Sequence, residues 1–97
     1  MKLLAIEKEL ATKTASTDKA LFEREARRAW ELTQSGIFRE MYFMRDRPLA
    51  VIILEADSVE AAKKALDSLP LVQEKIIDFD VMALAAYPGF ARLFKDP

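Results

Sequence analysis

The chain has 97 residues, 52% of them hydrophobic, and its 15 basic side chains nearly balance 16 acidic ones for a net charge of −1. This composition excludes a disordered or collagen-like chain, and the charge balance gives no long-range field that would attract nucleic acid. The chain has no Cys and no His, so acid–base chemistry would depend on Asp, Glu, Lys or Tyr, without thiolate or histidine groups.

The apolar stretches of the sequence are short. The first, Met1–Ile6, becomes charged at Glu7 and is too short for a signal peptide, and the run Leu49–Leu54 is far short of a membrane span. We therefore expect a cytoplasmic protein with neither membrane nor nucleic-acid partners, folded as one domain over residues 1–97.

The first half of the sequence begins with a strand and a helix. Residues 2–10 carry strand-forming apolar residues and end in a polar stretch typical of a loop. A helix is expected over 19–35, because a polar residue at 16–18 can cap its start and Gly36 can take the left-handed conformation that ends a helix.

Two strands follow in close succession. Residues 37–45 are rich in aromatic and strand-favouring side chains, residues 46–48 form a turn, and residues 49–55 are almost entirely apolar. Such an arrangement predicts an antiparallel hairpin. Strict alternation along the first of these strands places four side chains on one face, Phe38, Glu40, Tyr42 and Met44, with Ile37, Arg39, Met41 and Phe43 opposite.

A second helix is expected after the hairpin. Asp57 can cap it with Glu60 in the reciprocal capping-box position, and Pro70 ends it. Its apolar residues fall on one stripe, at Val59, Ala62, Leu66 and Leu69.

The last expected strand covers residues 76–84, with Ile77, Phe79 and Val81 on one face. The order strand, helix, strand, strand, helix, strand is the ferredoxin-like βαββαβ pattern, an α+β fold with both helices on one face of a four-stranded antiparallel sheet. The other sheet face carries large apolar residues, so we expect a homodimer that buries this face between two sheets.

Glu25 is the most informative charged residue of the first helix. At 100° per residue it falls between Leu32 and Ala29 on the apolar side. A carboxylate there costs free energy unless it is paired, hydrogen-bonded or neutral, so Glu25 is a candidate general acid–base group with a raised pKa. The alternative is that Glu25 lies at the edge of the stripe and reaches solvent, or pairs with an Arg.

The second strand supplies candidate ligand-binding residues. Phe38 and Tyr42 could line a pocket for a planar organic acid, and Arg39 could hold its carboxylate in bidentate fashion. The alternatives are ordinary core and dimer packing for the aromatic residues and a cross-sheet ion pair for Arg39. Asp78 and Asp80 are two residues apart on one strand without His, which is weak support for a metal, so we expect no metal site.

The end of the chain has apolar side chains at helical spacing over residues 88–94. Ten residues cannot bury these side chains alone. We expect this segment to dock on the body of the domain or on another subunit, and one Arg with one Lys makes a poor membrane anchor.

The second half of the chain resembles muconolactone isomerases. The resemblance rests on the helix and its end at Asp57–Leu71, the strand Ile77–Val81 and Tyr87-Pro88, and it extends back through Gly36–Arg39 to Glu25 without gaps. It covers roughly the last three-quarters of the chain. The chain departs from the family pattern in three ways: residues 41–48 differ from the family's hairpin, the first strand matches poorly, and there is no His.

This resemblance implies a dimeric α+β barrel, in which two four-stranded sheets face each other and dimers can build larger rings. It also implies an enzyme that moves a double bond in an unsaturated lactone acid by proton transfer, with no metal and no cofactor. Glu25 matches a helix glutamate of the active site in that family, and Phe38 matches a pocket tryptophan.

Two functions are therefore considered. In the first, the chain is a cofactor-independent isomerase in which Glu25 transfers the proton, Arg39 orients a small organic acid or lactone, and Phe38 with Tyr42 shapes the pocket. In the second, it is a non-catalytic oligomeric ligand-binding or structural protein. Heme or oxygenase chemistry lacks its axial His.

Overall fold

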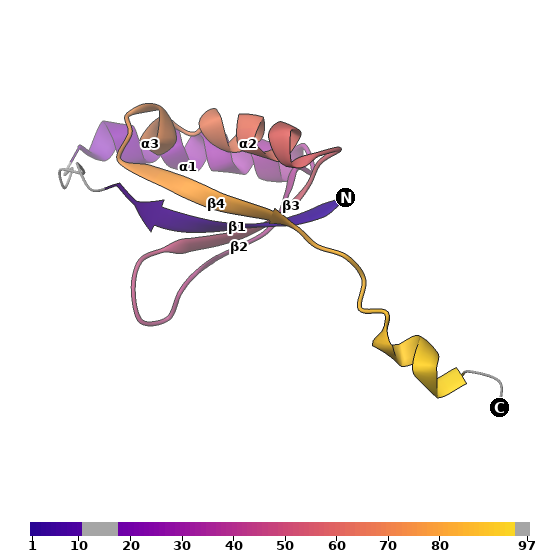
Figure 1. The fold of residues 1–97 in the computed structure, drawn as a ribbon. Helices are drawn as coiled ribbons and strands as arrows, with labels where there is room; N and C mark the ends of the chain where they lie inside the picture. The colour runs from indigo at the N-terminus through magenta and orange to yellow at the C-terminus, as the bar shows by residue number, and fades with distance from the viewer. Residues whose placement is uncertain (11–17, 95–97) are drawn as a thin grey trace.

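Four strands form one antiparallel sheet in the order β2-β3-β1-β4, with the helices on one of its faces (Figure 1). The computed structural model describes residues 1–10 and 18–94. Its elements in chain order are β1 (Lys2–Glu9), α1 (Lys19–Gln34), β2 (Phe38–Phe43), β3 (Ala50–Glu55), α2 (Val59–Asp67), α3 (Pro70–Gln73), β4 (Ile77–Ala83) and a 3₁₀ helix η1 (Gly89–Phe94). This arrangement confirms the ferredoxin-like α+β fold expected from the sequence.

Helix α1 begins and ends where its sequence signals predict. Asp18 is the N-cap, and its Oδ1 accepts hydrogen bonds from the backbone N–H of Ala20 at 2.9 Å and of Leu21 at 3.3 Å. The helix ends before Gly36, which has a φ of 85°. Ser16 and Thr17, the other candidate caps, lie outside the described residues.

The second helix differs from its prediction at both ends. Its N-cap is Ser58 rather than Asp57, because the Oγ of Ser58 accepts a hydrogen bond from the N–H of Ala61 at 3.0 Å. Pro70 does not end this helix, which stops at Asp67, but stands at the first position of α3. A proline is tolerated there because the first N–H of a helix has no intrahelical acceptor.

The pairing of β2 with β3 contains an irregularity at Arg39. Phe38 lies opposite Leu54, whereas Glu40 lies opposite Ile53, so one residue of β2 is left over between them. The extra residue moves Met41 and Phe43 to the face of the sheet that carries the helices. The prediction that Phe38 and Tyr42 share a face is therefore wrong, because strict alternation assumes a regular strand.

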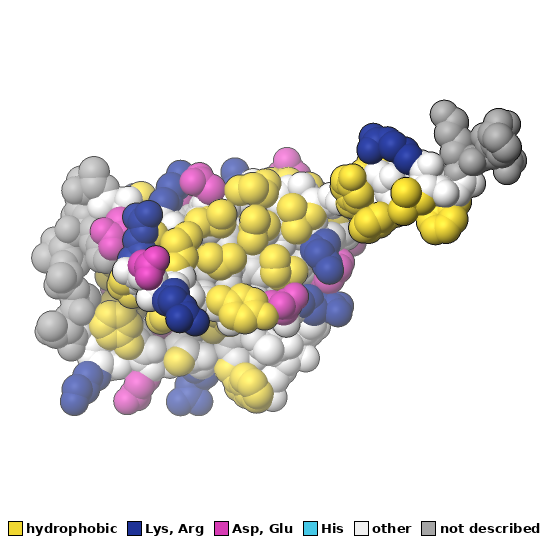
Figure 2. Space-filling model, turned by 90° about the horizontal axis from the view of Figure 1, so that it is seen from below, with side chains coloured by type: hydrophobic (Ala, Val, Ile, Leu, Met, Phe, Trp, Pro, Cys, Tyr) yellow, Lys and Arg dark blue, Asp and Glu magenta, His cyan; other side chains and the backbone are white. Residues whose placement is uncertain are grey.

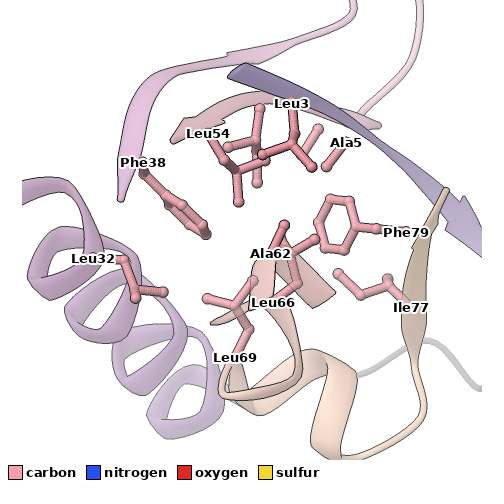
Figure 3. Close-up of a cluster of buried hydrophobic side chains, with 12 residues drawn as sticks. Leu3, Ala5, Leu32, Phe38, Leu54, Ala62, Leu66, Leu69, Ile77 and Phe79 are labelled. Atoms are coloured by element: carbon pink, nitrogen blue, oxygen red, sulfur yellow. The ribbon is translucent and has the colours of Figure 1, made fainter. Parts of the chain in front are cut away.

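The core lies between the sheet and the helices. Phe38, Leu54 and Leu3 are among its largest fully buried side chains, and Figure 3 shows them pointing toward Ala62, Leu66 and Leu69 of the helical layer. Full burial of one such side chain stabilises the fold by about 1.5–3 kcal/mol.

The opposite face of the sheet carries no helix. Figure 2 shows a broad apolar area on the side of the molecule seen from below. The cross-strand register assigns to this face, which we call the outer face, the apolar residues Leu4, Ile6, Tyr42, Val51, Ile53 and Met82. Tyr42 is 59% exposed and Met82 is 40% exposed.

The C-terminal segment extends away from the rest of the chain (Figure 1). Tyr87, Phe90, Leu93 and Phe94 are all exposed, and Tyr87 packs edge-on against Phe90 with 5.1 Å between ring centroids. The expectation that this segment docks on the body is not met in the single chain. Docking on another subunit stays a prediction. Within the described residues, no helix has the length and apolar character that a membrane crossing requires.

Candidate active site

Glu25 lies on the inner side of α1, half-buried against the short helix α3. Leu21 and Leu32 are the buried residues of the same helix, so Glu25 belongs to the face that packs toward the sheet. Its Oε1 accepts a hydrogen bond from the backbone N–H of Leu71 at 2.9 Å. The sequence analysis considered an ion pair between Glu25 and an Arg, but no described Arg pairs with Glu25. The backbone N–H of Leu71 holds the carboxylate instead.

The environment of Glu25 favours its neutral form. Burial raises the pKa of this carboxyl above its ordinary value, and the negative charge of Glu7 raises it further. The hydrogen bond from Leu71 acts in the other direction and lowers it, but the net pKa stays raised. A carboxyl group with a raised pKa is both a stronger base and a usable acid nearer neutral pH.

A cavity of about 270 Å³ opens beside Glu25, between the helices and the sheet. Apolar side chains make up almost all of its lining, which consists of Phe22, Ala26, Ala29, Met41, Phe43, Ala50, Ile52, Leu69, Leu71, Ile77 and Phe79, together with Glu7 and Glu25. Its apolar walls with few polar groups are typical of small-molecule sites.

Glu7 is a site residue that the sequence analysis did not single out. It lies opposite Phe79 in the pairing of β1 with β4, on the same face as the buried residues Leu3 and Ala5. Its Oε1 accepts a hydrogen bond from the N–H of Ala50 at 3.0 Å, where the backbone pairing of β1 with β3 has ended. The alternation Leu3, Ala5, Glu7 was the available signal, since it places a carboxylate in line with core residues.

The other three candidate residues do not line this cavity. Phe38 is 1% exposed and belongs to the core, as Figure 3 shows. Tyr42 lies on the outer face, where its hydroxyl donates a hydrogen bond to Glu40 at 2.7 Å, and this bond raises the pKa of the phenol. Arg39 is exposed, and its Nε donates a hydrogen bond to the carbonyl of Gly36 at the turn after α1.

The acidic pair of β4 consists of Asp78 and Asp80, which the sequence analysis weighed as a weak metal signal. Asp80 pairs with Lys8 at 3.1 Å, and the described residues contain no group of three His, Cys, Asp or Glu side chains placed to hold a metal ion. The Glu25 carboxyl, with its raised pKa, can supply proton transfer in these surroundings.

The raised pKa of Glu25 makes a prediction about stability and pH. A carboxyl that binds its proton more tightly in the folded state stabilises the fold below its unfolded pKa, near 4.5, and loses this contribution as the pH rises through its folded pKa. Relative to the Glu25→Gln variant, the wild-type unfolding equilibrium should therefore shift toward the unfolded state above pH 4.5, by up to about tenfold per pH unit. Urea denaturation of both proteins between pH 4 and 8 measures this difference, and a flat or rising difference would contradict the burial of Glu25.

Comparison with known proteins gives a family and a fold. The family model described as muconolactone delta-isomerase matches residues 5–89. A solved crystal structure of muconolactone isomerase is similar over 91% of this chain and 92% of that chain, with a TM-score of 0.72 and 24% sequence identity. No curated protein sequence matches the chain.

The structural likeness at this identity concerns the fold, whereas the family model matches most of the sequence, from within β1 to the start of η1. The chain belongs to the muconolactone delta-isomerase family.

Proposed function

We propose that the chain is a cofactor-independent isomerase that shifts a double bond in a small unsaturated lactone or organic acid by proton transfer through Glu25. The observation that supports this proposal is the position of the Glu25 carboxyl, half-buried at an apolar cavity and fixed by the Leu71 N–H. The family match adds that proteins with this sequence pattern are described as muconolactone delta-isomerases.

The reaction needs one group that removes a proton and returns it. The Glu25 carboxylate takes a proton from the carbon between the carbonyl and the double bond, and the C–H electron pair enters a conjugated dienolate. The resulting carboxylic acid then donates its proton, retained or exchanged with solvent, to the far carbon of the former double bond, and the double bond moves next to the carbonyl. No electron is gained or lost, so no oxidant or reductant is required.

The cavity supports this chemistry in two ways. Its lining is almost entirely apolar, so a bound substrate displaces the water that would otherwise compete for the proton and quench the dienolate. The Leu71 N–H holds one oxygen of Glu25, so the second oxygen, which has no hydrogen bond from a described residue, is free to face a substrate.

The test is to incubate the protein with β,γ-unsaturated five-membered lactones in D₂O and follow the ring protons by NMR. We expect protein-dependent conversion to the conjugated isomer, with some deuterium at the carbon that receives the proton. Absence of both conversion and exchange over a panel of lactones and their acids would favour the non-catalytic alternative.

We further propose that the outer face forms a homodimer. Ile53 lies near the middle of this face, opposite Leu4 on one side and Glu40 on the other. An apolar surface of this kind, uncovered in the single chain, is a common partner surface.

The variant Ile53→Lys should therefore weaken dimerisation by at least about a hundredfold, because an unpaired charge would be buried in the interface. Light scattering after gel filtration measures this change, with Ala61→Lys on the exposed side of α2 as the matched control. A wild-type protein that is monomeric at micromolar concentration, or an Ile53→Lys variant that stays dimeric, would contradict the proposed interface.

A further inference from the structure

Helix α3 is a short element whose place in the fold depends on its neighbours. It has four residues, none of them fully buried, and it lies beside α1 (Figure 1). A helix of one turn is not stable by itself, so contacts from outside must fix its position. Leu69, which precedes α3 and is 1% exposed, supplies one such contact, because its side chain lies in the core.

The N–H of Leu71 is available to Glu25 because of the way α3 begins. Pro70 stands at the first position and has no N–H, while the N–H of Leu71 at the second position has no acceptor within the helix. Glu25 of α1 supplies the acceptor at 2.9 Å. A shift of α3 along α1 would separate this donor from the carboxylate, so any contact that fixes the start of α3 also fixes Glu25.

A second hydrogen bond joins α1 to the same segment. The Nε of Arg28 donates to the Oγ of Ser68 at 2.9 Å, and the Ser68 hydroxyl in turn donates to the carbonyl of Ala65 in α2. Arg28 lies three residues after Glu25, on the same side of α1. Ser68 lies three residues before Leu71. Two hydrogen bonds therefore connect one side of α1 to the junction between α2 and α3.

We propose that Arg28 and Ser68 are positioning residues for the Glu25 carboxyl. Their hydrogen bond fixes the start of α3 against α1 and thereby keeps the Leu71 N–H on one oxygen of the carboxyl. Pro70 lies between the two bonds and has a fixed φ, so the segment that joins Ser68 to Leu71 is stiff. The consequence for turnover rests on the proposed function, because a carboxyl that transfers protons must hold a fixed orientation.

The burial of Leu69 provides a competing explanation. If the core contact of Leu69 alone fixed α3, loss of the Ser68 hydroxyl would leave the Leu71 N–H in place. Arg28 also has another partner, since its Nη1 lies 3.1 Å from the Oε1 of the exposed Glu31. The experiment therefore removes the Ser68 hydroxyl, which changes no charge, rather than the guanidinium.

The principal variant is Ser68→Ala, compared with the wild-type protein by three measurements. The Leu71 amide should exchange its hydrogen with solvent about fivefold or more faster, as measured by NMR, because α3 is less firmly held. The carbon-13 titration of Glu25 should move to higher pH, because the hydrogen bond from Leu71 lowers its pKa. The kcat for a lactone should fall by about three- to tenfold with KM within about twofold, because the cavity lining is unchanged.

The titration of Glu25 has few other sources of change in this variant. Among the described residues that line the cavity, Glu7 of β1 is the only other ionisable group, and α3 itself carries none. Arg28 keeps its charge in Ser68→Ala. A shift in the titration of Glu25 therefore reports on the hydrogen bond from Leu71.

Ser35→Ala is the matched control. The Ser35 hydroxyl donates to the carbonyl of Leu32, three residues earlier, as the Ser68 hydroxyl does to Ala65, but no described Arg donates to it. All three measurements should stay at their wild-type values in this variant. Ser68→Thr keeps a hydroxyl at the junction and should also retain them.

A variant of the donor tests the same hydrogen bond from its other side. Arg28→Met should accelerate exchange of the Leu71 amide to a similar extent as Ser68→Ala. The double variant should exchange no faster than either single variant, because all of them lose one and the same bond. Additive effects of the two substitutions would contradict the proposed pairing.

The proposal is overturned if Ser68→Ala leaves the Leu71 exchange rate and the Glu25 titration unchanged, or if Ser35→Ala changes them equally. Faster exchange with an unchanged kcat would give Arg28 and Ser68 a purely structural role and would also overturn it.

Failure of this proposal can be distinguished from failure of the proposed function. Amide exchange of Leu71 and titration of Glu25 are measured on the free protein and need no turnover. If both respond to Ser68→Ala in a protein that converts no lactone, the isomerase is contradicted and the positioning of the carboxyl is supported. If the wild-type protein converts a lactone and Ser68→Ala matches it in all three measurements, the isomerase is supported and the positioning role is contradicted.

Discussion

Replacing Glu25 with Gln is expected to lower the turnover of a lactone substrate by about 10²–10⁴-fold while the fold stays intact. The amide oxygen can still accept the hydrogen bond that Glu25 receives from the Leu71 N–H, so the local structure should be retained. The amide cannot remove a proton from carbon, which the proposed reaction requires. Initial rates by NMR and a thermal melt by circular dichroism measure the two effects.

The matched control is Glu23→Gln. Glu23 lies two residues earlier on the same helix and is exposed, so its loss changes the net charge equally without touching the cavity. Its turnover should stay within about twofold of the wild-type value. Equal losses in both variants, or full activity of Glu25→Gln, would remove Glu25 from the proposed reaction.

Replacing Phe38 with Ala should have the largest effect on stability, about 3–5 kcal/mol of the free energy of unfolding. The ring is 1% exposed and lies within the main core cluster, so its removal leaves a cavity that the surroundings cannot fill. Chemical denaturation monitored by far-ultraviolet circular dichroism measures the loss, which is a large part of the 5–15 kcal/mol typical of a domain.

Phe43→Ala separates packing from ligand binding. This side chain also comes from β2, but it is 71% exposed and lines the Glu25 cavity. We expect its loss to change stability by about 0.5 kcal/mol or less and to weaken ligand binding instead. The reverse pattern, with binding lost in Phe38→Ala at unchanged stability, would place Phe38 in the pocket.

The element order could be predicted because strand alternation, helical periodicity and the turn residues all agree. The ends of the second helix could not, because Asp57 and Ser58 are both good N-caps and only the backbone decides which side chain reaches the N–H of Ala61. A proline both ends one helix and begins another, so Pro70 alone does not fix the boundary.

The sequence could place a site residue correctly only where the direction of its side chain depends on a single helix or strand. Helical periodicity was sufficient to place Glu25 on the inner side of α1. Periodicity could not predict on which faces of the sheet Phe38 and Tyr42 lie. The irregularity at Arg39 depends on pairing with β3 and leaves no signature in the sequence of β2 alone. Recognising Glu7 required the register of β1 against its neighbours as well as the alternation within it.

The central claim is that Glu25 is an acid–base group in apolar surroundings, with a pKa raised above its ordinary value. Carbon-13 NMR of side-chain carboxyls, with Glu25→Gln to assign the signal, measures its titration directly. The claim predicts that Glu25 titrates clearly above the ordinary glutamate value, and that binding of a neutral lactone raises its pKa further by excluding water. A Glu25 carboxyl that titrates at or below the ordinary value, and does not respond to the lactone, would contradict the account.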